Sequence, residues 1–174
     1  MSRQGNKTVV RTFRVDEAAL EIVEKDAQEK RISANTLVNH LLLAYANYDR
    51  YLEHFPMLKI SSPIFGCLLD GVSDDYAKEA GKRLAQNLAR AVIISRRGGL
   101  SMSTLIDHFR DVSNYGKGFT LKEAEANGKT LVTLYHRYGR KGSLYFREYL
   151  AASFELIDKQ PKLTTTENSV TASF

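Results

Sequence analysis

The chain has 174 residues, of which 43% are hydrophobic and 26% charged, and its formal net charge is +5 at pH 7. A chain of this length and composition can pack one ordinary domain or two small ones, so a wholly disordered protein is excluded. The modest positive charge permits an anionic partner without requiring one.

The apolar runs are too short for a membrane segment. The longest run, 41–46, falls far below the roughly 20 residues that a spanning helix needs. The polar stretch 1–7 carries no signal-peptide core, so we expect a cytoplasmic protein without a membrane partner. The single cysteine, Cys67, lacks Cys or His neighbours at metal-ligand spacing, and we expect it to be buried and inert. We expect neither a metal site nor a cofactor.

The first predicted element is a short strand at 8–15. Its residues are β-branched, aromatic and largely alternating, which favours a strand with two unlike faces. Positive charge is concentrated here, because residues 1–15 contain no acid and four basic residues, namely Arg3, Lys7, Arg11 and Arg14.

Two helices follow this strand. Asp16 is a typical helix cap, and the first helix is predicted to run to about Lys30 with one apolar face. Ser33 is the preferred cap of the second helix and Asn35 the alternative, and this helix ends before Pro56. The apolar residues at helical spacing are Leu20, Val23 and Ala27 in the first helix and Leu37, Leu41, Tyr45, Tyr48 and Leu52 in the second.

The predicted strand has no partner close to it in the sequence. A lone strand is not stable, and a second copy of the chain can supply the missing neighbour in an antiparallel two-stranded ribbon. We therefore expect a homodimer with a core shared between the helices of both copies.

This order of elements resembles the ribbon-helix-helix family of transcriptional regulators. The resemblance covers 8–52 and rests on Arg14-Val15-Asp16-Glu17 at the first helix and on Ile32-Ser33, Thr36, Leu37 and Val38 at the second. It implies that the paired ribbon lies in the major groove of double-stranded DNA and that the second helix points its N-terminus at a phosphate.

The resemblance also implies roles for single residues. Phe13 and Val15 would face inward, and Val10, Thr12 and Arg14 would face the bases, with Arg14 able to bind guanine through two hydrogen bonds. The predicted phosphate contacts are Lys7, Arg11, Ser33, Asn35 and Thr36. The chain departs from the family pattern at Arg11, which has the inward parity, and at Arg31, which stands where the family often has glycine.

The remainder predicts a second domain that mixes helices and strands. We expect a strand at 57–61, helices at 63–69, 76–91 and from Ser101 or Ser103 to 114, and a final helix opened by Ser143. Residues 92–94 either extend a helix or form a buried strand. Asn127-Gly128 between two strand-like segments predicts a tight hairpin.

The fold class expected is therefore α+β. A ribbon-helix-helix domain at 1–54 precedes an α+β sensor or oligomerisation domain at 55–160, in which the hairpin packs on helices. A polar tail at 161–174 is expected to be disordered.

The second domain contains further residues that we considered as candidates for a functional site. The basic loops 96–99 and 140–142 precede helices but lack the spacing of a phosphate-binding loop. The group Asp107, His108 and Asp111 is expected to face solvent, and no nucleophile accompanies it, so no enzyme is predicted. The tyrosines that could line a pocket or belong to the core are Tyr135, Tyr138, Tyr145 and Tyr149.

Together these patterns predict a sequence-specific transcriptional regulator, a repressor that binds double-stranded DNA as a dimer or a tetramer of two dimers. One alternative is an antitoxin-like protein whose C-terminal half binds a partner protein. The other is a small-molecule sensor in which DNA contact is secondary.

Overall fold

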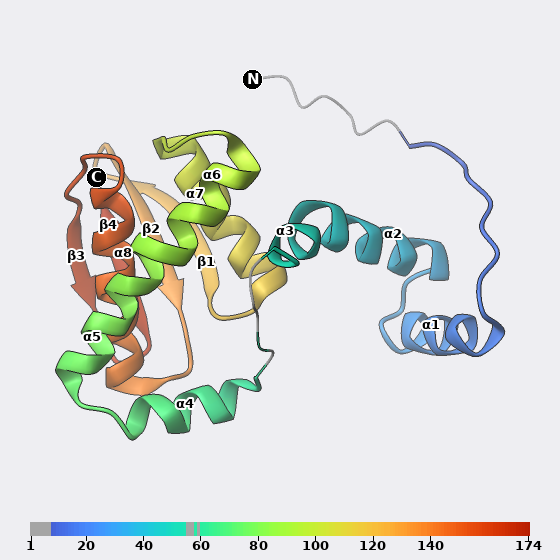
Figure 1. The fold of residues 1–174 in the computed structure, drawn as a ribbon, viewed down its shortest axis with the longest axis horizontal. Helices are drawn as coiled ribbons and strands as arrows, with labels where there is room; N and C mark the ends of the chain where they lie inside the picture. Colours follow the sequence, from blue (N-terminus) through green and yellow to red (C-terminus); the bar gives the residue numbers. More distant parts are fainter. Residues whose placement is uncertain (1–7, 55–57, 59) are drawn as a thin grey trace. The chain divides into compact units, whose positions relative to one another are not determined.

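The computed structural model describes residues 8–54, 58 and 60–174. The chain forms two compact units, Met1–Ala44 and Tyr45–Phe174. Their boundary falls within the predicted second helix, whereas we expected it after residue 54. Helices and an antiparallel sheet are both present, so the α+β class is confirmed (Figure 1). Lys7 and part of the strand expected at 57–61 lie outside the described residues.

Two helices form the described structure of the first unit. The α1 helix (Glu17–Glu29) begins where predicted, because the Asp16 carboxylate accepts a hydrogen bond from the Ala19 amide at 3.1 Å. The α2 helix (Ala34–Ala44) is capped by Ser33, whose Oγ accepts from the Thr36 amide at 3.0 Å. Ser33 rather than Asn35 is therefore the cap.

The turn between these helices has a left-handed residue. Arg31 adopts φ 55°, in the region that L residues other than glycine rarely occupy. This position is the one at which the sequence departs from the ribbon-helix-helix pattern by lacking glycine. The backbone at this position therefore has the conformation that favours glycine, although the residue there is an arginine.

The segment 8–15 is not a strand within the single chain. Its residues are exposed and have no strand neighbour among the described residues. The ribbon expected there needs a second chain, so a single chain does not test it.

The second unit contains most of the helices. It begins with a π-helical turn, η1 (Tyr45–Asp49), which is followed by α3 (Arg50–Leu52). Residues 92–94 lie in a helix, which settles the alternative left open by the sequence. The other helical elements are α4 (Ser62–Asp70), α5 (Asp74–Arg83), η2 (Leu84–Ala89), α6 (Arg90–Arg97), α7 (Met102–Asp111), η3 (Val112–Gly116) and α8 (Gly139–Glu155).

Four strands form one antiparallel sheet in the order β1-β2-β4-β3. They are β1 (Thr120–Ala126), β2 (Lys129–Tyr135), β3 (Lys162–Thr165) and β4 (Ser169–Ser173). The hairpin between β1 and β2 is confirmed, since Asn127 and Gly128 have φ 52° and 71°, as a tight two-residue turn requires.

The expectation of a disordered tail at 161–174 is wrong. These residues form β3 and β4, and β4 lies between β2 and β3. Val170 and Ala172 alternate with polar residues along β4 and are fully buried. Two small apolar residues are enough to hold this strand because its backbone is bonded on both edges.

The α8 helix packs on β3 and β4 and also against α5. It starts at Gly139, four residues before the predicted Ser143. The α5 and α8 backbones approach closely at Gly81, where an added Cβ would lie 2.0 Å from the Tyr145 carbonyl oxygen. Small buried residues continue this contact face at helical spacing, namely Ala77, Gly81, Ala85 and Ala89.

Candidate functional site

The residues predicted to contact bases are all exposed in the first unit. Val10, Thr12 and Arg14 lie on the unpaired segment before α1. Phe13 and Val15, predicted to face inward, are exposed as well, at 69% and 60%. The single chain therefore does not distinguish the two faces of the proposed ribbon.

The predicted phosphate contacts of α2 gather in its first turn. The Ser33 and Thr36 hydroxyl oxygens are 2.8 Å apart, and Asn35 is exposed between them in the sequence. This turn carries no acidic residue, so nothing in it opposes the positive end of the helix dipole. Arg11, the remaining described candidate, donates to the Val10 carbonyl at 3.2 Å and is exposed.

The first unit has almost no core of its own. Ala27 is its only buried residue among those described. Large side chains on both helices and on the preceding segment are more than a third exposed: Val9, Val10, Phe13, Val15, Leu20, Ile22, Val38, Leu41, Leu42 and Leu43. Large exposed apolar side chains indicate an association surface where they form a contiguous patch.

The group Asp107, His108 and Asp111 on α7 was predicted to face solvent, which is wrong for His108 and Asp111, whereas the Asp107 side chain is 37% exposed. His108 is 6% exposed and Asp111 9%. Asp111 accepts from Arg96 at 2.7 Å and from Arg97 at 2.9 Å. The sequence carried a signal for this burial, because His108 lies three residues after Leu105 and four before Val112, on the same helix face.

The basic loop 96–99 is a structural junction. Gly98 ends α6 in a left-handed conformation with φ 74°. Arg96, besides its ion pair with Asp111, donates to the Asn47 carbonyl and stacks over the Tyr51 ring at 5.0 Å. Arg96 therefore ties the η1–α3 segment to α6 and α7 within the second unit.

The basic stretch 140–142 also has structural contacts. It lies in the first turns of α8, where Arg140 pairs with Asp74 and Lys141 donates to the Asp70 carbonyl at 2.8 Å. These contacts join the start of α8 to the connection between α4 and α5. These contacts favour the interpretation of 140–142 as an ordinary helix start over its interpretation as a phosphate site.

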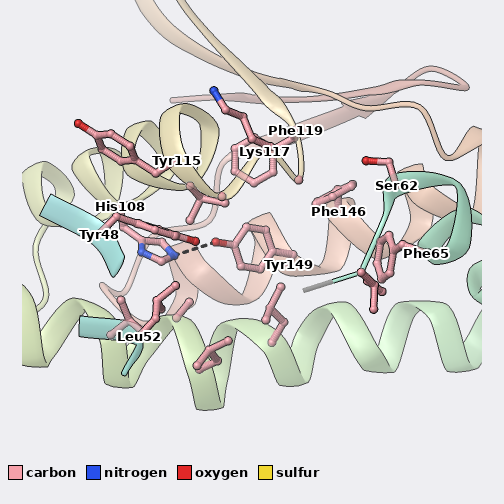
Figure 2. A pocket seen from close by; sticks show the side chains of 18 of the residues that line it. Tyr48, Leu52, Ser62, Phe65, His108, Tyr115, Lys117, Phe119, Phe146 and Tyr149 are labelled. Carbon is pink, nitrogen blue, oxygen red and sulfur yellow. Dashed lines mark hydrogen bonds between the residues drawn. The ribbon is translucent and has the colours of Figure 1, made fainter. Parts of the chain in front are cut away.

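A cavity of about 690 Å³ lies in the second unit. Three of the four tyrosines singled out from the sequence line it, namely Tyr138, Tyr145 and Tyr149. Tyr135 does not, because it is 45% exposed with the Lys122 ammonium 5.3 Å from its ring centre. Figure 2 shows Tyr48, Phe65 and His108 among the lining residues. The sequence placed Tyr48 on the apolar face of a helix and His108 in an exposed group, and it gave no role to Phe65.

Other classes of site find little support in the residues that the structure describes. These residues include no group of His, Cys, Asp and Glu arranged to hold a metal ion. None of their helices combines the length and apolar character needed to cross a membrane. Cys67 is exposed, so the expectation that it is buried is wrong.

Comparison of the chain with protein-family models, with curated proteins and with solved structures finds no significant match.

Proposed function

We propose that the chain is a sequence-specific DNA-binding regulator that acts as a homodimer and represses transcription by occupying its site. The observation that carries this proposal is the unpaired segment 8–15, which is basic and alternating, in front of two capped helices whose apolar side chains are exposed. A second copy would supply both missing partners at once. Two such segments would form a ribbon, and the exposed side chains of the helices would form a shared core.

The chemistry of the segment suits DNA. A two-stranded ribbon fits the major groove, where an arginine distinguishes guanine by two hydrogen bonds. In the proposed ribbon, the alternation of side chains places Arg14 on the outward face. Its side chain forms no ion pair with the other described residues. The first turn of α2, with Ser33, Asn35 and Thr36, would receive a phosphate at the positive end of the helix dipole.

The inter-helix turn supports the same proposal. Arg31 holds the left-handed conformation at the position where the ribbon-helix-helix pattern often places glycine. The second unit argues against the antitoxin-like alternative, since such tails usually order only on binding a partner. Here that half has a large core of its own, which includes the buried aromatic residues Phe109, Tyr149 and Phe154.

The proposal is tested by selecting bound fragments from random DNA with the full chain. We expect enrichment of a two-fold symmetric motif. Arg14→Ala should then lower affinity for that motif by about tenfold or more, since a two-bond contact to guanine contributes about 1–3 kcal/mol of discrimination. Its affinity for random DNA should change much less.

Arg147→Ala is the matched control. It removes the same charge from an exposed arginine of α8, in the second unit, that pairs with Glu148. We expect it to leave the preference for the motif unchanged. Failure to enrich any motif, or an equal loss of preference in both variants, would overturn the proposal.

A further inference from the structure

The cavity of the second unit has the size and lining of a small-molecule site. Its volume of about 690 Å³ falls within the range of roughly 300–1,000 Å³ typical of ligand pockets. Its walls are mainly aromatic and aliphatic, and they come from segments far apart in the chain. The rings of Phe65, Phe119, Tyr138, Tyr145 and Phe146 contribute to it.

One buried polar pair faces this apolar space. The His108 Nε2 atom lies 3.0 Å from the Tyr149 hydroxyl oxygen, and Figure 2 shows this bond among the lining side chains. His108 is 6% exposed and Tyr149 2%. The second ring nitrogen, His108 Nδ1, is buried without a hydrogen-bond partner among the described residues. Leaving a buried polar atom unsatisfied is costly, so such an atom points to a missing polar partner.

The lining groups are uncharged at neutral pH where they are buried. Burial lowers the pKa of His108 to about 4, with further lowering by Arg96 and Arg97. Burial raises the pKa of the Tyr149 hydroxyl well above its ordinary value. Asp49 and Lys117 also border the cavity, but both are exposed, and the Lys117 amine points away from the His108–Tyr149 pair. An ionic ligand would lose its hydration here without gaining a buried counter-charge.

We propose that this cavity binds an uncharged small molecule with an aromatic ring system and one hydroxyl or carbonyl group that hydrogen bonds to the His108–Tyr149 pair. The aromatic walls would hold the rings by edge and face contacts. The polar pair would fix the orientation of the ligand. This assignment does not depend on DNA binding, because every residue that carries it belongs to the second unit.

Two probes that differ by one hydroxyl group test the proposal, namely 2-naphthol and naphthalene. Each is titrated into the full-length protein and followed by its own fluorescence. We expect saturable binding of both at one site per chain, with 2-naphthol the tighter ligand. Tyr149→Phe keeps the ring and removes the hydroxyl. It should weaken 2-naphthol about three- to tenfold, the range for one net hydrogen bond, and change naphthalene little.

Three further variants separate the cavity from unspecific surface binding. Leu88→Trp and Leu52→Trp each enlarge a half-buried lining residue, on η2 and on α3. Either one that retains the wild-type circular dichroism spectrum should weaken both probes at least tenfold. Tyr135→Phe removes the hydroxyl of an exposed tyrosine outside the cavity and should change neither.

The assignment is overturned if neither probe binds saturably to the full chain. It is also overturned if Tyr149→Phe weakens both probes equally, or if the folded tryptophan variants bind as tightly as the wild type. Because DNA selection is a separate measurement, failure here leaves the proposed DNA-binding function standing.

Discussion

His136 shows how hydrogen bonds fix the tautomer of a buried histidine. Its Nδ1 atom accepts a hydrogen bond from the Tyr138 amide at 3.3 Å, so the proton of the neutral ring resides on Nε2. Nε2 then donates to Ser143 Oγ at 3.0 Å, and that hydroxyl donates to the Thr166 carbonyl at 2.6 Å. A second proton on the ring would break the first of these bonds. Independently of these bonds, burial lowers the pKa of His136 to about 4.

His108 should make the protein less stable in acid. Its pKa is about 4 in the folded state, against 6.5 for an ordinary histidine, because burial and the nearby Arg96 and Arg97 disfavour the charged ring. Between these values the unfolded chain binds more protons than the folded one. The stabilisation is therefore complete above pH 6.5 and is lost as the pH falls toward 4. This stabilisation contributes about 3 kcal/mol to the free energy of unfolding.

Urea unfolding of the wild type and His108→Gln at pH 7, 6, 5 and 4 measures this effect. The variant should show a shallower fall in the free energy of unfolding than the wild type. His40→Gln, which replaces an exposed histidine of α2, should follow the wild-type curve. A His108→Gln curve parallel to the wild type would contradict the prediction. His136 is kept in every variant, so its own effect in acid cancels in the comparison.

Among the elements, the contact between α5 and α8 depends on one glycine. An alanine Cβ at Gly81 would lie 2.0 Å from the Tyr145 carbonyl oxygen and 3.2 Å from the Tyr149 amide nitrogen. Both neighbours are backbone atoms of α8, which cannot move aside as a flexible side chain would. We expect Gly81→Ala to force the helices apart and to lower the free energy of unfolding by about 2–4 kcal/mol, as overpacking of a tight core does.

Gly66→Ala is the matched control within α4. There the nearest atom to an added Cβ is Tyr138 Cδ1 at 3.7 Å, an ordinary contact. Alanine is favoured over glycine in a helix interior by up to about 1 kcal/mol, so this variant should be as stable as the wild type or more so. Thermal unfolding of both variants measures the difference. Equal melting temperatures would show that α8 adjusts to the added methyl group.

Helix caps and tight turns could be predicted from neighbouring residues, whereas contacts between residues far apart in the sequence could not. Asp16, Ser101 and Asn127-Gly128 set a cap or a turn through bonds to residues within a few positions, so the sequence alone reveals them. The strand β4 was missed because one of its two edges pairs with β2, more than thirty residues earlier in the chain, although its other partner, β3, is close in sequence. The cavity was only partly anticipated for the same reason. Its tyrosines stood out in the sequence, but Tyr48 and Phe65 reach it from other elements.

At the scale of the whole molecule, the two units differ in how they are stabilised. The second unit buries a continuous core that includes Phe109, Leu134 and Phe154. The first unit buries only Ala27 among its described residues. A pair of helices with so little buried apolar surface cannot offset the conformational entropy lost on folding. The first unit therefore requires additional apolar contacts, which the proposed homodimer would supply.

Leu41 and Ile64 offer a matched test of that requirement. Both are helix residues exposed to a similar extent in the single chain, at 55% on α2 and 54% on α4. In a lone chain, glutamate at either position would be tolerated. In the proposed dimer, Leu41→Glu would place a charge in the shared core, and burying an unpaired charge costs several kcal/mol.

Sedimentation equilibrium at micromolar concentration should therefore find the wild type and Ile64→Glu as dimers and Leu41→Glu as a monomer. Leu41→Glu should also lose helical circular dichroism and affinity for the selected DNA motif, because the ribbon would form only when two chains meet. A monomeric wild type would remove the basis of the ribbon. A dimeric Leu41→Glu that still binds the motif would place the contact between copies elsewhere on the molecule.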